Sequence, residues 1–175
     1  GSDRRARMGR VIRDARLDDA AELARVHVSS WRAAYRGLID QDFLDSLNVA
    51  DRTDNWSRIL RQTRGRALVA ESNGEIVGFC VVGPSLDLDW GEVYSIYLAP
   101  QHWGQGHGRE LLAAAEQALA GSGHHRAMLW VLDTNHRARA FYERQGWVIG
   151  KPIRIENIGG KDVNEVRYEK ALALP

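Results

Sequence analysis

The sequence has a single cysteine, no long apolar run and no apolar leader, and each absence narrows the class of protein. Cys80 lies inside an apolar stretch, is typical of a small core residue and permits no internal disulfide. No stretch approaches the roughly eighteen consecutive apolar residues of a membrane span. Residues 1–7 are basic and polar with no apolar segment behind them, unlike a signal peptide, and Gly1-Ser2 resembles a tag remnant. We therefore expect a cytoplasmic protein whose residues 1–9 are a tag or a disordered N-terminus.

Positive charge is missing from one part of the chain. The 24 basic and 23 acidic residues leave a formal net charge of +1, which argues against a dedicated nucleic-acid binder. Residues 67–105 contain no Lys or Arg, but they do contain Glu71, Glu75, Asp87, Asp89 and Glu92. If the loop with Asp87 and Asp89 borders a binding site, its negative rim favours a cationic ligand. The six histidines lack metal-ligand spacing, so no metal is predicted.

The remaining composition predicts one soluble domain over residues 10–173. The chain is 44% apolar and 27% charged, without repeats or linkers. Asp19 and Glu22 resemble a capping box at the start of a helix that ends at Gly37, and Asn73-Gly74 is typical of a hairpin turn. Strands are predicted at 10–15, 67–71, 76–82, 92–98, 127–132, 148–155 and 164–172, and further helices at 42–47, 51–62, 106–120 and 135–145. This order predicts a mixed α/β sheet.

A glycine-rich loop, Gln101-His102-Trp103-Gly104-Gln105-Gly106-His107-Gly108-Arg109, follows a predicted strand and opens an amphipathic helix. Glycines allow a close backbone approach, and the free N–H groups of a helix start bind anions. A phosphate-binding P-loop is excluded because Arg109-Glu110 follows Gly108, and a dinucleotide fingerprint fits poorly because Arg109 replaces its third glycine. The loop thus predicts a phosphorylated ligand of another kind, with a plain tight turn as the alternative.

Three motifs resemble the GCN5-related N-acetyltransferase (GNAT) family over residues 67–148. Gln101, Gly104 and Gly106 match its acyl-CoA pattern, residues 94–100 resemble its fourth strand and exit, and residues 135–147 match Asn-x-x-Ala-x-x-Phe-Tyr-Glu-x-x-Gly-aromatic. The resemblance implies a single-domain α/β fold. Its sheet would be mixed and mostly antiparallel, with a splayed pair of central strands flanked by helices.

The resemblance also implies acetyl-CoA as cosubstrate. Its pantetheine arm would lie between the backbones of residues 96–98 and 130–132, and its pyrophosphate on the N–H groups of residues 103–108. The cofactor-binding residues implied are Ile96, Tyr97, Leu98, Gln101, His102, Trp103, Gly104, Gln105, Gly106, His107, Gly108, Arg109, Asn135 and Tyr142.

In the family's Phe-Tyr-Glu helix the tyrosine is the usual general acid, a position that Tyr142 occupies. Glu92 is the candidate base, and its alternative is a solvated carboxylate at a strand end. Counting in twos places Glu92 on one face with Tyr94, Ile96 and Leu98, unless a bulge of the kind common in this family intervenes.

The acceptor site is predicted to include Trp31, Tyr35, Tyr94, Asp87 and Asp89, and for Trp31 core packing is the alternative. The function predicted is N-acetylation of a small cationic amine. The alternatives are a protein N-terminal or lysine acetyltransferase and a non-catalytic acyl-CoA sensor. The predicted partners are acetyl-CoA and an amine acceptor, with no nucleic acid or membrane and with a possible homodimer.

Overall fold

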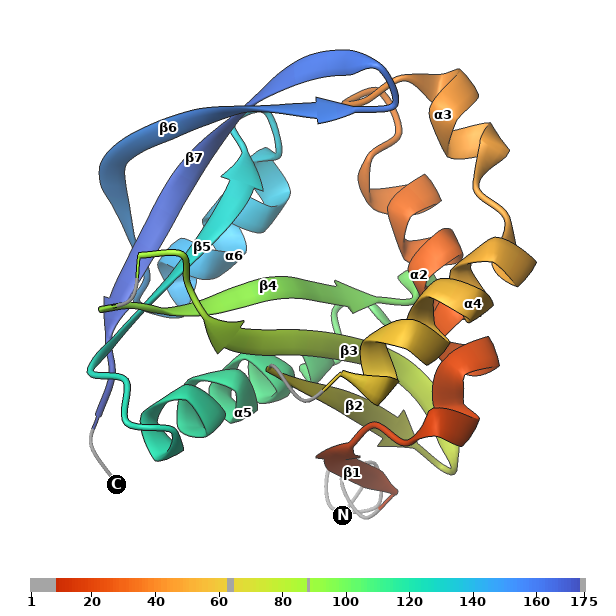
Figure 1. Ribbon diagram of the computed structural model, residues 1–175, viewed down its shortest axis with the longest axis horizontal. Coiled ribbons are helices and arrows are strands. Elements are labelled where there is room, and N and C mark those ends of the chain that lie inside the picture. The colour runs from red at the N-terminus through yellow and green to blue at the C-terminus, as the bar shows by residue number, and fades with distance from the viewer. Residues whose placement is uncertain (1–8, 63–64, 88, 174–175) are drawn as a thin grey trace.

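A seven-stranded sheet forms the centre of the molecule, in the order β1-β2-β3-β4-β5-β7-β6 (Figure 1). The computed structural model describes residues 9–62, 65–87 and 89–173, so the predicted N-terminal tag or disordered segment lies outside the described residues apart from Gly9. The strands are β1 Arg10–Asp14, β2 Arg66–Ser72, β3 Glu75–Pro84, β4 Gly91–Leu98, β5 Arg126–Leu132, β6 Val148–Ile158 and β7 Lys161–Ala171. Neighbouring strands are antiparallel except β4 and β5, which are parallel. The predicted mixed, mostly antiparallel sheet is confirmed.

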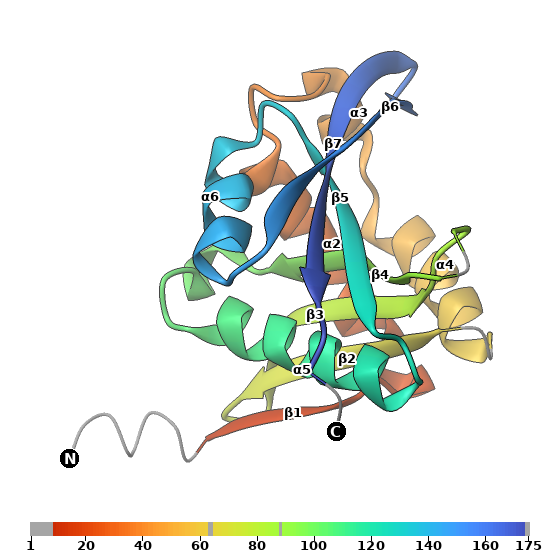
Figure 2. The ribbon, with the colours of Figure 1, turned by 90° about the vertical axis from the view of Figure 1, so that its left-hand side faces the viewer.

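Helices cover both faces of the sheet (Figure 2). They are α2 Ala20–Ala34, α3 Gln41–Ser46, α4 Val49–Arg61, α5 His107–Gly121 and α6 His136–Arg144, with short 3-10 turns η1 Leu17–Asp19 and η2 Pro100–His102. Helices α5 and α6 bury their apolar sides in one core cluster with the sheet, while α2 and α4 form a second cluster on the opposite face. No helix in the described ranges is long and apolar enough to cross a membrane.

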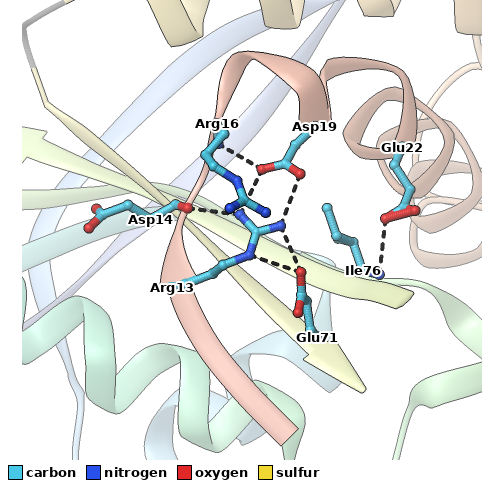
Figure 3. Close-up of polar contacts among 7 residues, drawn as sticks. All are labelled: Arg13, Asp14, Arg16, Asp19, Glu22, Glu71 and Ile76. Atoms are coloured by element: carbon cyan, nitrogen blue, oxygen red, sulfur yellow. Dashed lines mark hydrogen bonds and ion pairs between the residues drawn. The ribbon is translucent and has the colours of Figure 1, made fainter. Parts of the chain in front are cut away.

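The start of α2 differs from the prediction. The Asp19 carboxylate accepts hydrogen bonds from the Arg13 guanidinium at 2.8 and 2.9 Å and from the Arg16 N–H at 2.7 Å, and Glu22 accepts from the Ile76 N–H (Figure 3). The predicted Asp19–Glu22 capping box on α2 is therefore wrong. Charge-assisted bonds to a guanidinium are stronger than a neutral cap, and β1 brings Arg13 within reach of Asp19. These contacts tie the entry of α2 to β1 and β3.

The hairpin between β2 and β3 agrees with the sequence. Asn73 and Gly74 have φ of 54° and 80°, the left-handed pair that a two-residue turn of this kind requires. Its strands carry buried side chains on both faces, and they support β4 beside them.

A bulge in β4 decides which way its side chains point. Ser95 pairs with Val81 and Val93 with Val82, so Tyr94 is an extra residue between two consecutive positions of β3. Gly91 and Val93 therefore share the α5 face with Ile96 and Leu98, instead of alternating with them. The simple count in twos is corrected here, since the bulge moves Glu92 to the face of β4 that carries Tyr97 and looks toward α2.

Strands β4 and β5 separate after a short contact. They pair only at Gly91 with Ala127 and at Glu92 with Met128. Beyond this point the backbone of residues 96–98 faces that of residues 130–132 across a gap, which confirms the predicted splayed pair. The gap in the sheet is where a ligand can enter.

Candidate active site

A cavity of about 1210 Å³ opens between the splayed strands. Its walls come from α2, β4, β5, the loop before α5, α6 and the β6–β7 hairpin. The predicted site residues that line it are Trp31, Tyr35, Glu92, Tyr94, Ile96, Tyr97, Leu98, Trp103, Gly104, Gln105, Gly106, Gly108, Arg109, Asn135 and Tyr142. One cavity thus brings together most of the residues predicted for both substrates.

One end of the cavity combines a helix start with guanidinium groups. The first N–H groups of α5 have no partner inside the helix, and Gly104 and Gly106 before it have φ of 76° and 88°. Arg10 and Arg109 line this end, and Arg10 is 3.1 Å from the Glu110 carboxylate. Free N–H groups at a helix start beside guanidinium groups suit phosphate oxygens.

Three members of the predicted cofactor set do not line the cavity. Gln101 is exposed, His107 is 1% exposed within the core, and His102 lies against the His107 ring at 6.0 Å between ring centres. The reason is the geometry of the helix start. The side chain of His107 is buried, while its N–H belongs to the first turn of α5.

Trp103 and Arg137 connect the glycine loop to α6. The Trp103 indole N–H donates to the Leu98 carbonyl at 3.0 Å, and the Arg137 guanidinium lies 3.5 Å from the centre of the Trp103 ring. Arg10 and Arg137 were not predicted, because both stand at positions without a motif requirement. Only the fold shows that they face the cavity.

Asn135 holds the start of α6. Its Oδ1 accepts from the Ala138 N–H at 3.2 Å, the N-cap arrangement that satisfies a free donor of the first turn. Asn135 also lines the cavity, so the residue predicted to touch pantetheine positions the helix that carries Tyr142.

Tyr142 lines the cavity from α6. Its ring is 8% exposed and packs near Trp147 and Tyr168. Burial raises the pKa of Tyr142 above its usual value of 10.0, so the hydroxyl is protonated at neutral pH. Within the described part of the chain that hydroxyl makes no hydrogen bond, and it therefore remains available to donate a proton.

Glu92 is the acidic group nearest the start of the splay. Its side chain is half-buried, and this burial raises its pKa, while the positive charge of Arg154 acts in the opposite direction. A carboxylate with a raised pKa is a stronger proton acceptor than one in water.

The chain's relatives can now be compared with this geometry. The model of the acetyltransferase (GNAT) family matches residues 25–147. This protein belongs to the GNAT family. An uncharacterized N-acetyltransferase of Bacillus subtilis is 35% identical over 128 residues, which are 71% of this chain and 73% of that protein. A probable N-acetyltransferase of Mycobacterium tuberculosis is 26% identical over 94% of this chain and 95% of its own. The protein is thus an acyltransferase of the N-acetyltransferase class.

Solved structures of GNAT enzymes share the fold. PaiA N-acetyltransferase of Thermoplasma acidophilum, in complex with coenzyme A, has a TM-score of 0.70 at 22% identity and covers 93% of this chain and 98% of its own. YncA of Salmonella typhimurium, a putative acetyltransferase with its cofactor acetyl-CoA, has a TM-score of 0.68 at 20% identity, over 94% and 95% of the two chains. These structures agree with the single-domain α/β architecture described above.

Aromatic side chains of α2 and β4 form one wall of this GNAT cavity. The hydroxyls of Tyr35 and Tyr97 are 2.7 Å apart, and the Trp31 ring lies edge-on to Tyr35 at 4.9 Å. Burial raises the pKa of Tyr35 to about 12, so both members of the pair keep their protons at neutral pH. Trp31 also packs on His27 at 5.3 Å, and it serves both the core and the cavity.

The carboxylates at the acceptor end differ from those predicted. Asp87 and Asp89 lie on the exposed loop between β3 and β4 and do not line the cavity. Hydrogen bonds from Ser85 N–H to the Trp90 carbonyl and from Trp90 N–H to the Asp87 carbonyl close this loop on itself. The loop therefore turns at the sheet end instead of forming the rim.

Carboxylates of the β6–β7 hairpin line the cavity instead. Glu156 and Glu165 join Glu92 there, beside the guanidinium of Arg154, which contacts Glu165 at 2.7 Å. Arg154 also lies 4.6 Å from the Trp130 ring centre. In the sequence, the charged residues of β6 and β7 alternate with apolar residues, and this alternation was the available signal for a charged strand face. Which face of the strands lines the cavity depends on the fold.

Tyr94, which was predicted for the acceptor site, both lines the cavity and contacts the end of β3. It lines the cavity beside the bulge, and its hydroxyl donates to the Pro84 carbonyl.

Among the described residues, no three His, Cys, Asp or Glu side chains form a group able to hold a metal ion.

Proposed function

We propose that this GNAT enzyme transfers an acetyl group from acetyl-CoA to the primary amine of a small cationic acceptor, by direct attack while both substrates are bound. The observation that carries the proposal is the polarity of the cavity. Its lining includes Arg10, Arg109 and the start of α5, with Glu110 beside Arg10, and a second group made of Glu92, Glu156 and Glu165 around Arg154.

The cofactor end suits acetyl-CoA. Its thioester supplies an activated acetyl group. The N–H groups at the start of α5 would bind phosphate oxygens, with Arg10, Arg109 and Arg137 contributing positive charge. Residues 96–98 pair with β3 and residues 130–132 with β7, but the two segments do not pair with each other, so their facing edges would hydrogen-bond an extended amide chain laid between the two strands.

The proton transfers assign roles to two side chains. A cationic ammonium must lose one proton to become a nucleophile, and Glu92 would accept it directly or through a water molecule. The departing thiolate needs one proton, which the Tyr142 hydroxyl would donate, and the second proton that the nitrogen loses as the amide forms would restore that hydroxyl. An N–H of the segment 96–98 would stabilise negative charge that develops on the carbonyl oxygen. No covalent bond to the enzyme is required.

The acceptor end favours a cation. The three carboxylates Glu92, Glu156 and Glu165 outnumber the two guanidinium groups that act on Glu92, those of Arg154 and Arg167, so the local field attracts an ammonium group. The rings of Trp31 and Tyr35 present faces and edges of the kind that accommodate cationic groups.

A small acceptor is favoured over a protein chain by the roof of the cavity. The tip of the β6–β7 hairpin reaches α3, where Lys161 contacts Asp40 at 2.9 Å and the Phe43 ring packs on Gly159 (Figure 1). Because the neighbouring Ile158 and Leu38 line the cavity, this contact would close the side that a polypeptide acceptor would need as an open groove. A non-catalytic sensor is disfavoured because it would not need both Glu92 and Tyr142 in the cavity.

The proposal is tested by thiol release from acetyl-CoA across a panel of polyamines, aminoglycosides, amino acids and short peptides. We expect the best acceptors to carry net positive charge and their KM to rise with salt. Glu165→Gln should raise the KM for a cationic acceptor roughly tenfold, the effect of losing about 1.4 kcal/mol. Asp87→Asn, which removes an equal charge outside the cavity, is the matched control and should not change KM. A neutral or acidic best acceptor with salt-independent KM would refute the cationic assignment.

Cofactor binding is tested separately by thermal denaturation. Acetyl-CoA should raise the melting temperature, whereas NADH and ATP should raise it weakly or not at all, because the loop fits neither nucleotide fingerprint. Stronger stabilisation by NADH or ATP would overturn the cofactor assignment whatever the acceptor.

A further inference from the structure

The side chain of Arg10 reaches the start of α5 from a separate strand. Arg10 is the first residue of β1, and it lines the cavity beside Gly106, the residue that precedes α5. A Cβ atom placed on Gly106 would lie 3.5 Å from Nη1 of Arg10 and 3.9 Å from Nη2 of Arg109. Two guanidinium groups therefore approach the same point at the helix start, one from β1 and one from α5 itself.

Glu110 holds one of these two guanidinium groups. Nη1 of Arg10 donates to Oε1 of Glu110 at 3.1 Å, and the two side chains are 18% and 35% exposed. Glu110 lies in the first turn of α5 and lines the cavity as well. A carboxylate in the first turn of a helix is attracted by the partial positive charge of the helix start, as a phosphate is. Glu110 therefore uses the same positive groups that a phosphorylated ligand would use.

A pyrophosphate is the stronger ligand for this guanidinium. The planar guanidinium matches both a carboxylate and a phosphate in shape, but a pyrophosphate carries more negative charge and more acceptor oxygens. A partly exposed ion pair shifts an equilibrium by up to about fivefold, whereas a charge-assisted hydrogen bond to a phosphate shifts it by about tenfold or more. Arg10 can therefore leave Glu110 for a phosphate oxygen, and the net gain is smaller than the new bond alone would provide.

We propose that Arg10 exchanges Glu110 for the pyrophosphate of coenzyme A, so that Glu110 competes with the cofactor and lowers its affinity. The inference rests on the proposed use of acetyl-CoA but not on the identity of the acceptor. Acetyl-CoA and the product CoA carry the same phosphates, so the competition weakens the binding of both and favours release of CoA after the transfer. Arg10 lies outside residues 25–147 that the family model matches, so membership of the family assigns it no role.

A double-mutant cycle followed by calorimetry with CoA tests the exchange. Glu110→Gln should tighten CoA binding about fivefold, because Arg10 then has no ion pair to break. Arg10→Gln should weaken binding about threefold in the wild-type background and about fifteenfold in the Glu110→Gln background, where the full bond to phosphate is lost. Acetyl-CoA should give the same ratios.

The decisive comparison is Glu110→Gln in a chain that already carries Arg10→Gln. With no ion pair left to break, this change should alter CoA affinity less than about twofold. If Glu110 only repelled the phosphates, the gain in affinity would be equally large with and without Arg10, and the exchange would be refuted. If Arg10→Gln leaves CoA affinity unchanged in both backgrounds, Arg10 does not contact the ligand and the proposal is wrong.

Dephospho-CoA, which keeps the pyrophosphate and lacks the phosphate on the ribose, identifies the phosphate involved. The Arg10→Gln loss should be equal for CoA and dephospho-CoA. A loss confined to CoA would overturn the pyrophosphate assignment.

Glu116→Gln is the matched control on the same helix. Glu116 contacts Lys170 at 2.7 Å and does not line the cavity. It lies about 9 Å further along α5 than Glu110, so its charge is largely screened from the helix start. This variant should bind CoA like the wild type, and a gain equal to that of Glu110→Gln would assign the effect to net charge and overturn the proposal.

Circular dichroism and melting temperature confirm that each variant folds. A wild-type chain that binds no CoA would refute the cofactor assignment itself. Normal binding by the wild type, with additive effects of the Arg10 and Glu110 changes, would refute only the exchange.

Discussion

Replacing Tyr142 by Phe removes one hydroxyl and keeps the ring. In the described structure this hydroxyl has no hydrogen-bond partner and the ring packs near Trp147 and Tyr168. The stability cost should therefore stay within about 0.5 kcal/mol. The lost group matters only if it donates a proton during the reaction.

The expected loss of activity follows from the acidity of the group. A positioned general acid contributes roughly 10²- to 10⁴-fold to the rate. Burial raises the pKa of Tyr142, which makes the phenol a weaker acid and favours the lower end of that range. We expect the Tyr142→Phe kcat to fall by about 10²-fold, equivalent to about 2.7 kcal/mol of transition-state stabilisation, with acetyl-CoA affinity nearly unchanged.

Tyr168→Phe is the matched control in the same aromatic cluster. Its hydroxyl donates to Glu143 at 2.6 Å and accepts from Arg139 at 3.2 Å, and it does not line the cavity. Loss of these bonds should cost about 1–3 kcal/mol of stability and change kcat by no more than about twofold. Thiol release and urea unfolding of both variants separate the two effects. The reasoning fails if Tyr142→Phe retains full kcat, or if Tyr168→Phe loses as much activity as Tyr142→Phe.

Three further changes have defined outcomes. Gly106→Val should weaken acetyl-CoA binding at least tenfold by calorimetry, because φ at this position is +88°, while Gly121→Val at the open end of α5 should not. Glu92→Gln should lower kcat by about 10²-fold and remove the acidic limb of the pH profile, since the wild-type base is active only above its raised pKa; an acidic limb that persists would identify another base. Burial lowers the pKa of His27 to about 4 from an unfolded value near 6.5, so folding stability should be lost as pH falls from 6.5 to 4, by up to about 3 kcal/mol. Urea unfolding at pH 7 and pH 4.5 should show a smaller loss for His27→Gln, and equal losses would contradict this origin.

Local chemistry was sufficient to predict some features of the fold. Asn73-Gly74 prefers the left-handed conformations of a tight hairpin whatever surrounds it, and the glycines before α5 likewise specify an open helix start. The order of apolar runs predicted the strand sequence. In each case the determining interaction lies within a few residues.

Features that depend on distant partners were predicted incorrectly or not at all. Asp19 was expected to cap α2, but Arg13 from β1 recruits its carboxylate. Asp87 and Asp89 were expected at the acceptor rim, whereas Glu156 and Glu165 reach the cavity from the far end of the chain. The spacing of residues in the sequence cannot predict these contacts, because each contact depends on how separate strands pack together.

The extra residue Tyr94 determines the face of β4 to which Glu92 belongs. Val93 faces the core beside α5, and Glu92 faces the cavity, only because Tyr94 is an extra residue between two consecutive positions of β3. Taking Tyr94 into the regular ladder would exchange the two, exposing a valine to the substrates and burying a carboxylate in an apolar core. Deleting Tyr94 would instead leave Val93 and Ser95 opposite Val82 and Val81, with both faces kept. Substitutions in β4 therefore alter single contacts, whereas a slip of its register by one residue exchanges the two faces. Register, more than composition, is the constrained property of this strand during evolution or engineering.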